Sequence, residues 1–321
     1  VVLVDATKLP WRDDAATDAS HHALLPQTRR HALLLQLLRV PSVVFAVNKL
    51  DAVGEPARAF ANIGRALTRF AEAAGFPVAA IVPISALQGH NVVSAAPRGW
   101  CGYRGDSLLD ILQGLPATPA ETTQAFAFPV QWIEKRSDAS HTDKGRRIFW
   151  GRVATGLLRV GQALTVLPGG KTATVAEVLD HARVAGEVPA GRSAGIVLDR
   201  ELDVSRGDWL LAAGDTFRPV AELECTVAWL DDEPLVAGRA YWALHGHRWV
   251  KARAERILHQ RNIHTLAEEP ATTLASNTIG RVVLKLQAPI ACLPYHASRV
   301  MGSLVLVDTV THRTAGAALL S

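Results

Sequence analysis

Cysteine, tyrosine and methionine are scarce in this chain of 321 residues, which contains three cysteines, three tyrosines and a single methionine. Cys101, Cys225 and Cys292 lie far apart, without the CxxC spacing of a zinc site or the density of a disulfide scaffold. Their separation predicts reduced thiols with no catalytic or metal-binding role, as expected for a cytoplasmic protein.

Long apolar runs are also missing. The apolar stretches 42–47 and 79–84 are far shorter than the roughly 20 residues that a membrane-spanning helix needs. The first residues form an apolar run without a preceding positive segment or a cleavage site, so they do not resemble a signal peptide. The chain begins with Val1, which favours a piece of a longer protein, although processing would give the same start. We therefore predict a soluble, cytoplasmic, multidomain protein with no membrane partner.

Charge is not concentrated in any one block of the chain. The 34 Lys and Arg residues and the 30 Asp and Glu residues give a formal net charge of +4. A basic balance can indicate a nucleic-acid partner, but phosphate-backbone binding needs several cations that converge on one stripe. Because the cations here are dispersed, the sequence argues against a nucleic-acid partner.

The first third of the chain alternates short apolar runs with helical patterns, which is typical of a parallel sheet covered by helices. We expect strands at 1–5, 42–48 and 79–85, and helices at 28–38, 56–74 and 107–113. Gly75 is placed to end the second helix, and Asp106 is placed to cap the third, whose leucines are expected to point to the core.

Beyond residues 115–119, a Pro-containing stretch that we interpret as a linker, short β-rich runs replace the helical periods. Turn signals such as Pro168-Gly169-Gly170 separate these runs, a pattern typical of closed antiparallel barrels. The predicted fold class is therefore α/β plus all-β, with a partial parallel sheet of the P-loop-GTPase type followed by two antiparallel β-barrels. The predicted domains are residues 1–118, 119–215 and 216–321.

The sharpest local signal is Asn48-Lys49-Leu50-Asp51, which directly follows an expected strand. Ligands of open α/β sheets bind at the carboxyl ends of the strands. In the Asn-Lys-x-Asp pattern of GTP-binding proteins, the carboxylate accepts hydrogen bonds from two N–H donors of guanine. Adenine presents the opposite pattern at that edge, and an unmatched charged hydrogen bond costs roughly 1.5–3 kcal/mol. Asp51 would thus favour guanine about tenfold to a hundredfold.

A second loop supports this interpretation. Ser85-Ala86-Leu87 ends the next strand, and such a loop in translation-factor-type GTPases turns backbone N–H groups toward the guanine oxygen. Both loops leave the same edge of one βαβ unit, so we expect them to converge. The predicted binding residues are listed together here: Asn48, Lys49, Asp51, Ser85, Ala86 and Leu87.

From these loops outward the chain resembles the GTP-binding large, regulatory subunit of bacterial sulfate adenylyltransferase, a relative of elongation factor Tu. The segments that carry the resemblance cover nearly the whole chain: 4–6, 27–31, 44–49, 83–92, 128–131, 151–156, 203–208, 233–235, 281–284, 289–291 and 302–308. The stretch 203–208, and the pairing of 233–235 with a late Asp308, favour this family over elongation factor Tu itself.

The resemblance implies a role in sulfate assimilation. In this family the large subunit hydrolyses GTP, and a small catalytic subunit transfers the adenylyl group of ATP to sulfate and releases pyrophosphate. GTP hydrolysis would drive this uphill step through domain movement. The implied partner is thus the small subunit, the implied ligand is GTP, and the catalytic residues for adenylyl transfer are expected on the other polypeptide.

The sequence departs from the family in the motifs with which a GTPase binds the phosphates of GTP. Ahead of Asn48, where the family has them, the Gly-rich phosphate loop, the switch threonine for magnesium and the Asp-x-x-Gly segment do not occur in these residues. Gly169-Gly170-Lys171-Thr172 copies only the end of a phosphate loop and is interpreted as a hairpin turn. We therefore expect this chain to contact the guanine part of GTP only, with Mg²⁺ bound only in the intact protein, and to show no GTP turnover.

Residues 6–26 form a longer connection than the family has. Its Asp13-Asp14 and His21-His22 could suggest a metal site, but their spacing fits no compact coordination pattern, and we interpret the connection as a surface loop. A separate hypothesis is that this loop alters partner docking. The segment Arg29-Arg30-His31 is interpreted as a solvated basic face, with contact to the catalytic subunit or a switch as the alternative.

His245 and His247 are interpreted as turn residues rather than metal ligands, and the tryptophans of the β modules as core or interface residues. Two other functions stay open. A translation-type factor would bind aminoacylated tRNA through the barrels, and a nonhydrolytic scaffold would only dock the catalytic subunit.

Overall fold

The computed structural model describes residues 1–12, 24–97, 100–118, 120–135, 147–180, 182, 186–214 and 217–321. Two compact units form, one from Val1–Thr118 with Arg261–Glu269 and the other from Pro119–Gln260 with Pro270–Ser321. The finer division into three domains stays a prediction. Within the described ranges, no helix combines the length and apolar character that crossing a bilayer requires.

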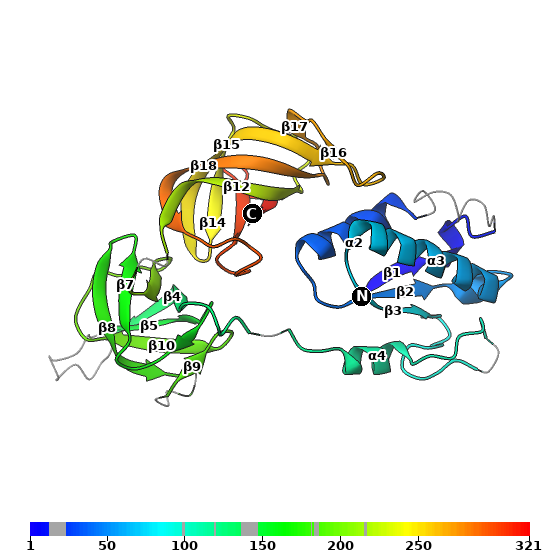
Figure 1. Ribbon diagram of the computed structural model, residues 1–321, viewed down its shortest axis with the longest axis horizontal. Coiled ribbons are helices and arrows are strands. Elements are labelled where there is room, and N and C mark those ends of the chain that lie inside the picture. Colours follow the sequence, from blue (N-terminus) through cyan, green and yellow to red (C-terminus); the bar gives the residue numbers. More distant parts are fainter. Residues whose placement is uncertain are drawn as a thin grey trace. The chain divides into compact units, whose positions relative to one another are not determined.

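The first unit contains a three-stranded parallel sheet in the order β1-β2-β3. Its strands are β1 (Val2–Asp5), β2 (Val43–Asn48) and β3 (Val78–Pro83). Its helices are α2 (Pro26–Leu37), α3 (Pro56–Ala74) and α4 (Leu108–Gly114), with 3-10 turns η1 (Ala6–Lys8) and η3 (Leu50–Ala52). Figure 1 shows α2 and α3 on one side of the sheet and α4 on the other. The predicted parallel sheet with covering helices is confirmed.

Helix α3 follows directly from its sequence. Ile63, Leu67 and Phe70 recur every three to four residues, and all three are buried. Gly75 adopts the left-handed conformation (φ 75°) and its N–H donates to the carbonyl of Ala71, which ends the helix where the sequence predicted.

Helix α4 differs from the prediction in two details. Its cap is Ser107, whose hydroxyl accepts the N–H of Asp110 at 3.2 Å, because Ser107 and not Asp106 directly precedes the first helical residue. Leu108 packs against the apolar face of β2 and β3, but Leu109 and Leu112 are exposed, since a two-turn helix can turn only one stripe toward the sheet.

The second unit contains two closed antiparallel barrels, as predicted. The strands of the first barrel are β4 (Ala127–Lys135), β5 (Arg147–Arg152), β7 (Ala163–Leu167), β8 (Lys171–Leu179), β10 (Ser193–Leu198) and β11 (Trp209–Ala212). They are neighbours in the order β10-β5-β4-β11-β7-β8. A separate short pair consists of β6 (Leu157–Leu158) and β9 (Val188–Pro189).

The second barrel has the order β14-β19-β20-β12-β18-β15 and closes through the pairing of β14 with β15. Its strands are β12 (Pro219–Trp229), β14 (Ala240–His245), β15 (Arg248–Arg261), β18 (Ile279–Ala291), β19 (Ser303–Asp308) and β20 (Thr314–Leu320). Strand β16 (Glu268–Glu269) adds to β15, and β13 (Leu235–Val236) pairs with β17 (Thr273–Leu274). Alternate side chains fill both barrel interiors.

The two barrels meet inside this unit at a contact that we call the inter-barrel seam, formed by Asp208, Trp209, His245, Arg248 and Met301. The indole of Trp209 stacks on the imidazole of His245, with ring centroids 5.0 Å apart. The Nε2 atom of His245 lies 3.0 Å from the carbonyl of Met301, and Arg248 pairs with Asp208 at 3.2 Å. Burial lowers the pKa of His245 to about 4, so the imidazole is neutral at physiological pH.

Candidate functional site

Two loops leave the carboxyl ends of β2 and β3, and a hydrogen-bonded asparagine joins them. The side-chain oxygen of Asn48 accepts the backbone N–H of Lys49 at 2.8 Å and that of Ala86 at 3.0 Å. The β3 ladder also runs on past its last assigned residue, because the N–H of Ile84 donates to the carbonyl of Val47 at 2.8 Å. The structure thus brings the two predicted loops together at one edge of the sheet.

Lys49 has an unusual backbone. Its φ of 64° and ψ of 28° lie in the left-handed region, which costs a residue other than glycine on the order of 1–3 kcal/mol. The conformation is held by the Asn48 side chain on one side and by the fully buried Leu50 on the other. Non-glycine residues in such conformations gather at binding sites. Six other non-glycine residues also have a positive φ, so the conformation of Lys49 supports a site at this turn only together with the sequence pattern.

Asp51 follows within the short turn η3 and is partly exposed. Its carboxylate belongs to the same loop as Lys49, on the edge where the Ala86 loop arrives. A carboxylate in that place can accept two parallel N–H donors from a planar ring. Whether Asp51 does so stays a prediction.

The second loop is a tight turn from Ser85 to His90. Ser85 is fully buried, its hydroxyl accepts the N–H of Gln88 at 3.1 Å, and its own N–H donates to the carbonyl of His90 at 3.2 Å. Leu87 at the tip of the turn is 89% exposed. One expected donor is committed within the protein, because the N–H of Ala86 binds Asn48. The apolar side chain of Leu87 is left open to a ligand.

Asp5 is a member of this edge that the sequence analysis quoted as part of the family resemblance but did not count among the site residues. The parallel register places Asp5 beside Asn48, and its carboxylate binds the ammonium of Lys49 at 2.7 Å. Burial alone would raise the pKa of Asp5, but hydrogen bonds from Lys49 and Thr7 outweigh it and hold that pKa below its usual value. A carboxylate at the end of the strand next to Asn48 was the signal available in the sequence.

Arg29 contradicts the prediction of a solvated basic face. Its side chain is fully buried, lies over the ring of Phe70 at 5.4 Å and donates long hydrogen bonds to the carbonyls of Leu24, Ile263 and His264 at 3.3–3.5 Å. Arg30 and His31 are exposed, as predicted. Because α2 turns Arg29 inward and its neighbours outward, one basic triplet serves two different faces.

Two of the three acceptors of Arg29, the carbonyls of Ile263 and His264, belong to the segment Arg261–Glu269, which is part of the first unit. Asn262 organises this segment, since its side-chain oxygen accepts the N–H groups of His264 and Thr265 at 2.7 and 3.1 Å. Its amide nitrogen also donates to Glu269 at 2.7 Å. The carbonyls of Ile263 and His264, which face Arg29, are therefore held in a preformed turn.

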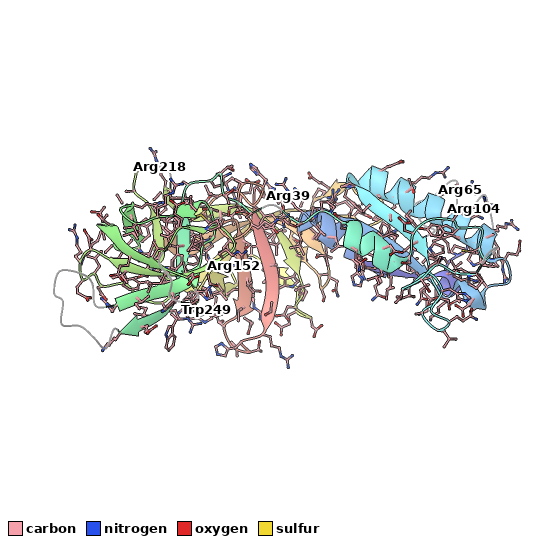
Figure 2. The ribbon with its side chains drawn as sticks, turned by 90° about the horizontal axis from the view of Figure 1, so that it is seen from below. Arg39, Arg65, Arg104, Arg152, Arg218 and Trp249 are labelled. Carbon is pink, nitrogen blue, oxygen red and sulfur yellow. The ribbon has the colours of Figure 1, made fainter. Side chains whose placement is uncertain are left out.

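The remaining sequence interpretations have mixed outcomes. The hairpin turn at Gly169–Thr172 is confirmed, because β7 and β8 pair across it. His247 lies in the turn as predicted, whereas His245 is the buried last residue of β14 and not a turn residue. Trp209 and Trp229 are buried as expected, whereas Trp132 and Trp249 are more than half exposed and so are not core residues. Trp249 is labelled in Figure 2.

Asp13-Asp14 and His21-His22 lie outside the described residues. Among the residues that are described, no three His, Cys, Asp or Glu side chains are grouped so that they could hold a metal ion. Burial raises the pKa of Cys225 to about 12 and that of Cys292 to about 11, and it also raises the pKa of Cys101.

Comparison with protein families matches both ends of the chain. Residues 1–124 match the elongation factor Tu GTP-binding domain, and residues 222–321 match the GTP-eEF1A C-terminal domain-like family.

Several curated proteins are similar along most of the chain. Sulfate adenylyltransferase subunit 1 of Laribacter hongkongensis is 34% identical over 306 residues, which cover 94% of this chain and 61% of that protein. The same subunit of Citrobacter koseri is 34% identical and covers 99% of this chain and 63% of its own length. The bifunctional enzyme CysN/CysC of Xylella fastidiosa is 35% identical over 100% of this chain and 48% of its own length. The chain thus spans about half to three fifths of these relatives.

Among solved structures, sup35 complexed with GDP is similar with a TM-score of 0.56 and 20% identity, covering 99% of this chain and 76% of that chain. At this identity the likeness establishes a shared fold.

Proposed function

This chain belongs to the elongation-factor-Tu-like GTPases, in the group of sulfate adenylyltransferase subunit 1, and from that premise we propose that its joined loops recognise guanine within the GTPase subunit of a sulfate adenylyltransferase. The observation that carries the proposal is the pair of hydrogen bonds that the Asn48 side-chain oxygen accepts from the backbone N–H groups of Lys49 and Ala86. Those bonds fix two loops, from two strands, in one arrangement beside Asp51.

Each predicted site residue then has a role. Asp51 accepts the two N–H donors of the guanine edge, Asn48 braces both loops, and the stem of Lys49 covers one face of the ring. Leu87, open at the tip of its turn, offers apolar contact to the base, while Ser85 and Ala86 shape that turn. An adenine base would place an acceptor against the Asp51 carboxylate, which disfavours ATP at this site.

The reaction of the whole protein is adenylyl transfer from ATP to sulfate, driven by GTP hydrolysis in the intact large subunit. The residues for the transfer itself lie on a small catalytic subunit, the partner that we propose for this chain in the cytoplasm. Mg²⁺ and the phosphates of GTP require a phosphate loop, a pattern that does not occur in these 321 residues. We therefore expect this polypeptide to bind guanine nucleotides weakly and to show no GTP turnover.

The proposal is tested by the affinity of the purified chain for fluorescently labelled GDP, with unlabelled GDP and ADP as competitors. We expect GDP to compete about tenfold to a hundredfold better than ADP, and Asp51→Ala to remove this preference, since a charged hydrogen-bond pair is worth roughly 1.5–3 kcal/mol. Equal competition by GDP and ADP, or an unchanged preference in Asp51→Ala, contradicts guanine recognition.

Partnership is tested separately. Copurification with the small subunit of a similar organism, followed by measurement of pyrophosphate release from ATP and sulfate, is expected to show a complex. GTP hydrolysis by the chain alone that exceeds the level of Asp51→Ala would contradict the expected lack of turnover.

A further inference from the structure

We propose that Asp5 is a positioning residue of the guanine site, which holds the Lys49 side chain where its stem covers a bound purine. The inference rests on the proposed function, because it assigns a role to Asp5 within the same site. Asp5 would act through Lys49 and would not touch the nucleotide itself.

The sheet brings the two residues together. β1 and β2 are parallel neighbours, and Asp5 and Asn48 are partners in register at the last position of each strand. Lys49 follows at once, in a left-handed conformation that redirects the chain out of β2. The Asp5 carboxylate and the Lys49 ammonium then meet at 2.7 Å.

The Asp5 carboxylate is held in place by Thr7, independently of the lysine. One oxygen of Asp5 accepts both the backbone N–H of Thr7 at 3.0 Å and the hydroxyl of Thr7 at 2.6 Å. The other oxygen is the one that binds Lys49. An ordinary surface ion pair contributes little because two flexible side chains must be ordered. Here one partner is already ordered, so the pair holds the lysine more firmly than a typical exposed pair.

The lysine is held at its two ends and open between them. Its N–H is bound to Asn48, its ammonium is bound to Asp5, and its side chain is 54% exposed. A stem tethered in this way is a ready surface for a flat ring, and ordering it in advance removes part of the entropy cost of binding. Without Asp5 the free stem would have to be ordered by the ligand.

A purely structural role for Asp5 is the alternative, because the same carboxylate also caps the short turn η1. The two roles differ in what they couple. A cap couples Asp5 to Thr7 and to stability, whereas a positioning role couples Asp5 to Lys49 and to nucleotide affinity.

The test is a double-mutant cycle on the affinity of the 321-residue chain for GDP. Asp5→Ala and Lys49→Met, which keeps the stem and removes the ammonium, are each expected to weaken GDP binding about threefold to fivefold. The double variant is expected to be no weaker than Lys49→Met alone, since each change breaks the same contact. The loss in Asp5→Ala should shrink as salt is raised. Lys8→Met, a lysine on the neighbouring turn, is the matched control and should leave GDP affinity unchanged.

The outcomes separate this inference from the proposed function. If the chain prefers GDP, Asp51→Ala removes the preference, and the effects of Asp5→Ala and Lys49→Met simply multiply, the positioning role is wrong and guanine recognition stands. If the chain shows no preference for GDP, both fail. If thermal unfolding shows that Asp5→Ala is unfolded, Asp5→Asn, which keeps an oxygen for Thr7, takes its place in the cycle. The two outcomes above are then interpreted in the same way.

Discussion

The carboxyl edge of the β1–β2–β3 sheet and the inter-barrel seam use polar side chains in opposite ways. At the sheet edge, Asp5 and Lys49 form their ion pair in the open, and the lysine side chain is half exposed. At the seam, His245 is fully buried, stacked on Trp209 and bonded to the carbonyl of Met301.

This difference shows what each region can do. Polar groups at the seam have exchanged water for partners inside the protein, so their loss should appear as a loss of stability. Polar groups at the sheet edge remain accessible, so their loss should appear mainly in ligand affinity. Substitutions in the two regions can therefore break or sharpen the contrast.

The largest expected effect is the pH dependence conferred by His245. The unfolded histidine titrates near 6.5, whereas burial lowers its pKa in the folded protein to about 4. Between these values the unfolded chain binds a proton that the folded chain does not. The free energy of unfolding should thus fall as pH drops from 6.5 to 4, by about 3 kcal/mol at most.

Urea unfolding followed by tryptophan fluorescence at pH 7, 5.5 and 4.5 measures this dependence. His245→Gln is the control, because its amide can still donate to Met301 and does not titrate. The wild type should lose more stability than the variant over this range, and a parallel decline of the two would show that another group is responsible.

A smaller loss is expected from Asp208→Ala at the same seam. The Asp208 carboxylate accepts the N–H of Ser205 at 2.9 Å and pairs with Arg248 at 3.2 Å, so its removal should cost about 2 kcal/mol of unfolding free energy. Denaturant titration of Asp208→Ala, Arg248→Met and the double variant separates the pair from the turn. Surface substitutions usually change the free energy of unfolding by no more than about 0.5 kcal/mol. If Asp208→Ala stays within that limit, the seam resembles the exposed sheet edge.

The smallest effect on stability is expected from Asn48→Ala at the sheet edge. The change removes two hydrogen bonds, to Lys49 and Ala86, in a partly exposed place and should cost about 1 kcal/mol. Amide hydrogen exchange at Ala86 should quicken, and GDP affinity should fall with it. Unchanged exchange at Ala86 would mean that the two loops are joined by something other than this side chain.

Much of the fold could be predicted because local sequence patterns identify its helices and strands. The apolar stripe of α3 and its terminal glycine, and the alternation within β7 and β12, require only periodicity and turn chemistry. Near-neighbour choices were harder. Asp106 and Ser107 are both good caps, and only the path of the backbone decides between them.

The candidate site was predictable to the extent that strand ends gather ligands. Asn48 and Ala86 are joined as that rule suggests. The place of Asp5 in the site was missed because its partner Lys49 is distant in sequence and is brought near only by the register of two strands. Arg29 was missed because a charged triplet is normally solvated, and nothing local indicates that carbonyls from residues 263 and 264 will surround it.

Residues 261–269 carry a practical consequence for dissecting this molecule. They are assigned to the first unit although the flanking chain belongs to the second, so the polypeptide passes from one unit to the other at three points: 118/119, 260/261 and 269/270. A fragment ending at residue 118 would retain Arg29 but lack two of its carbonyl acceptors. The buried guanidinium would then lose those hydrogen bonds inside an apolar interior. An excised nucleotide domain that is to be soluble and well behaved should accordingly carry the 261–269 peptide, grafted or supplied in trans.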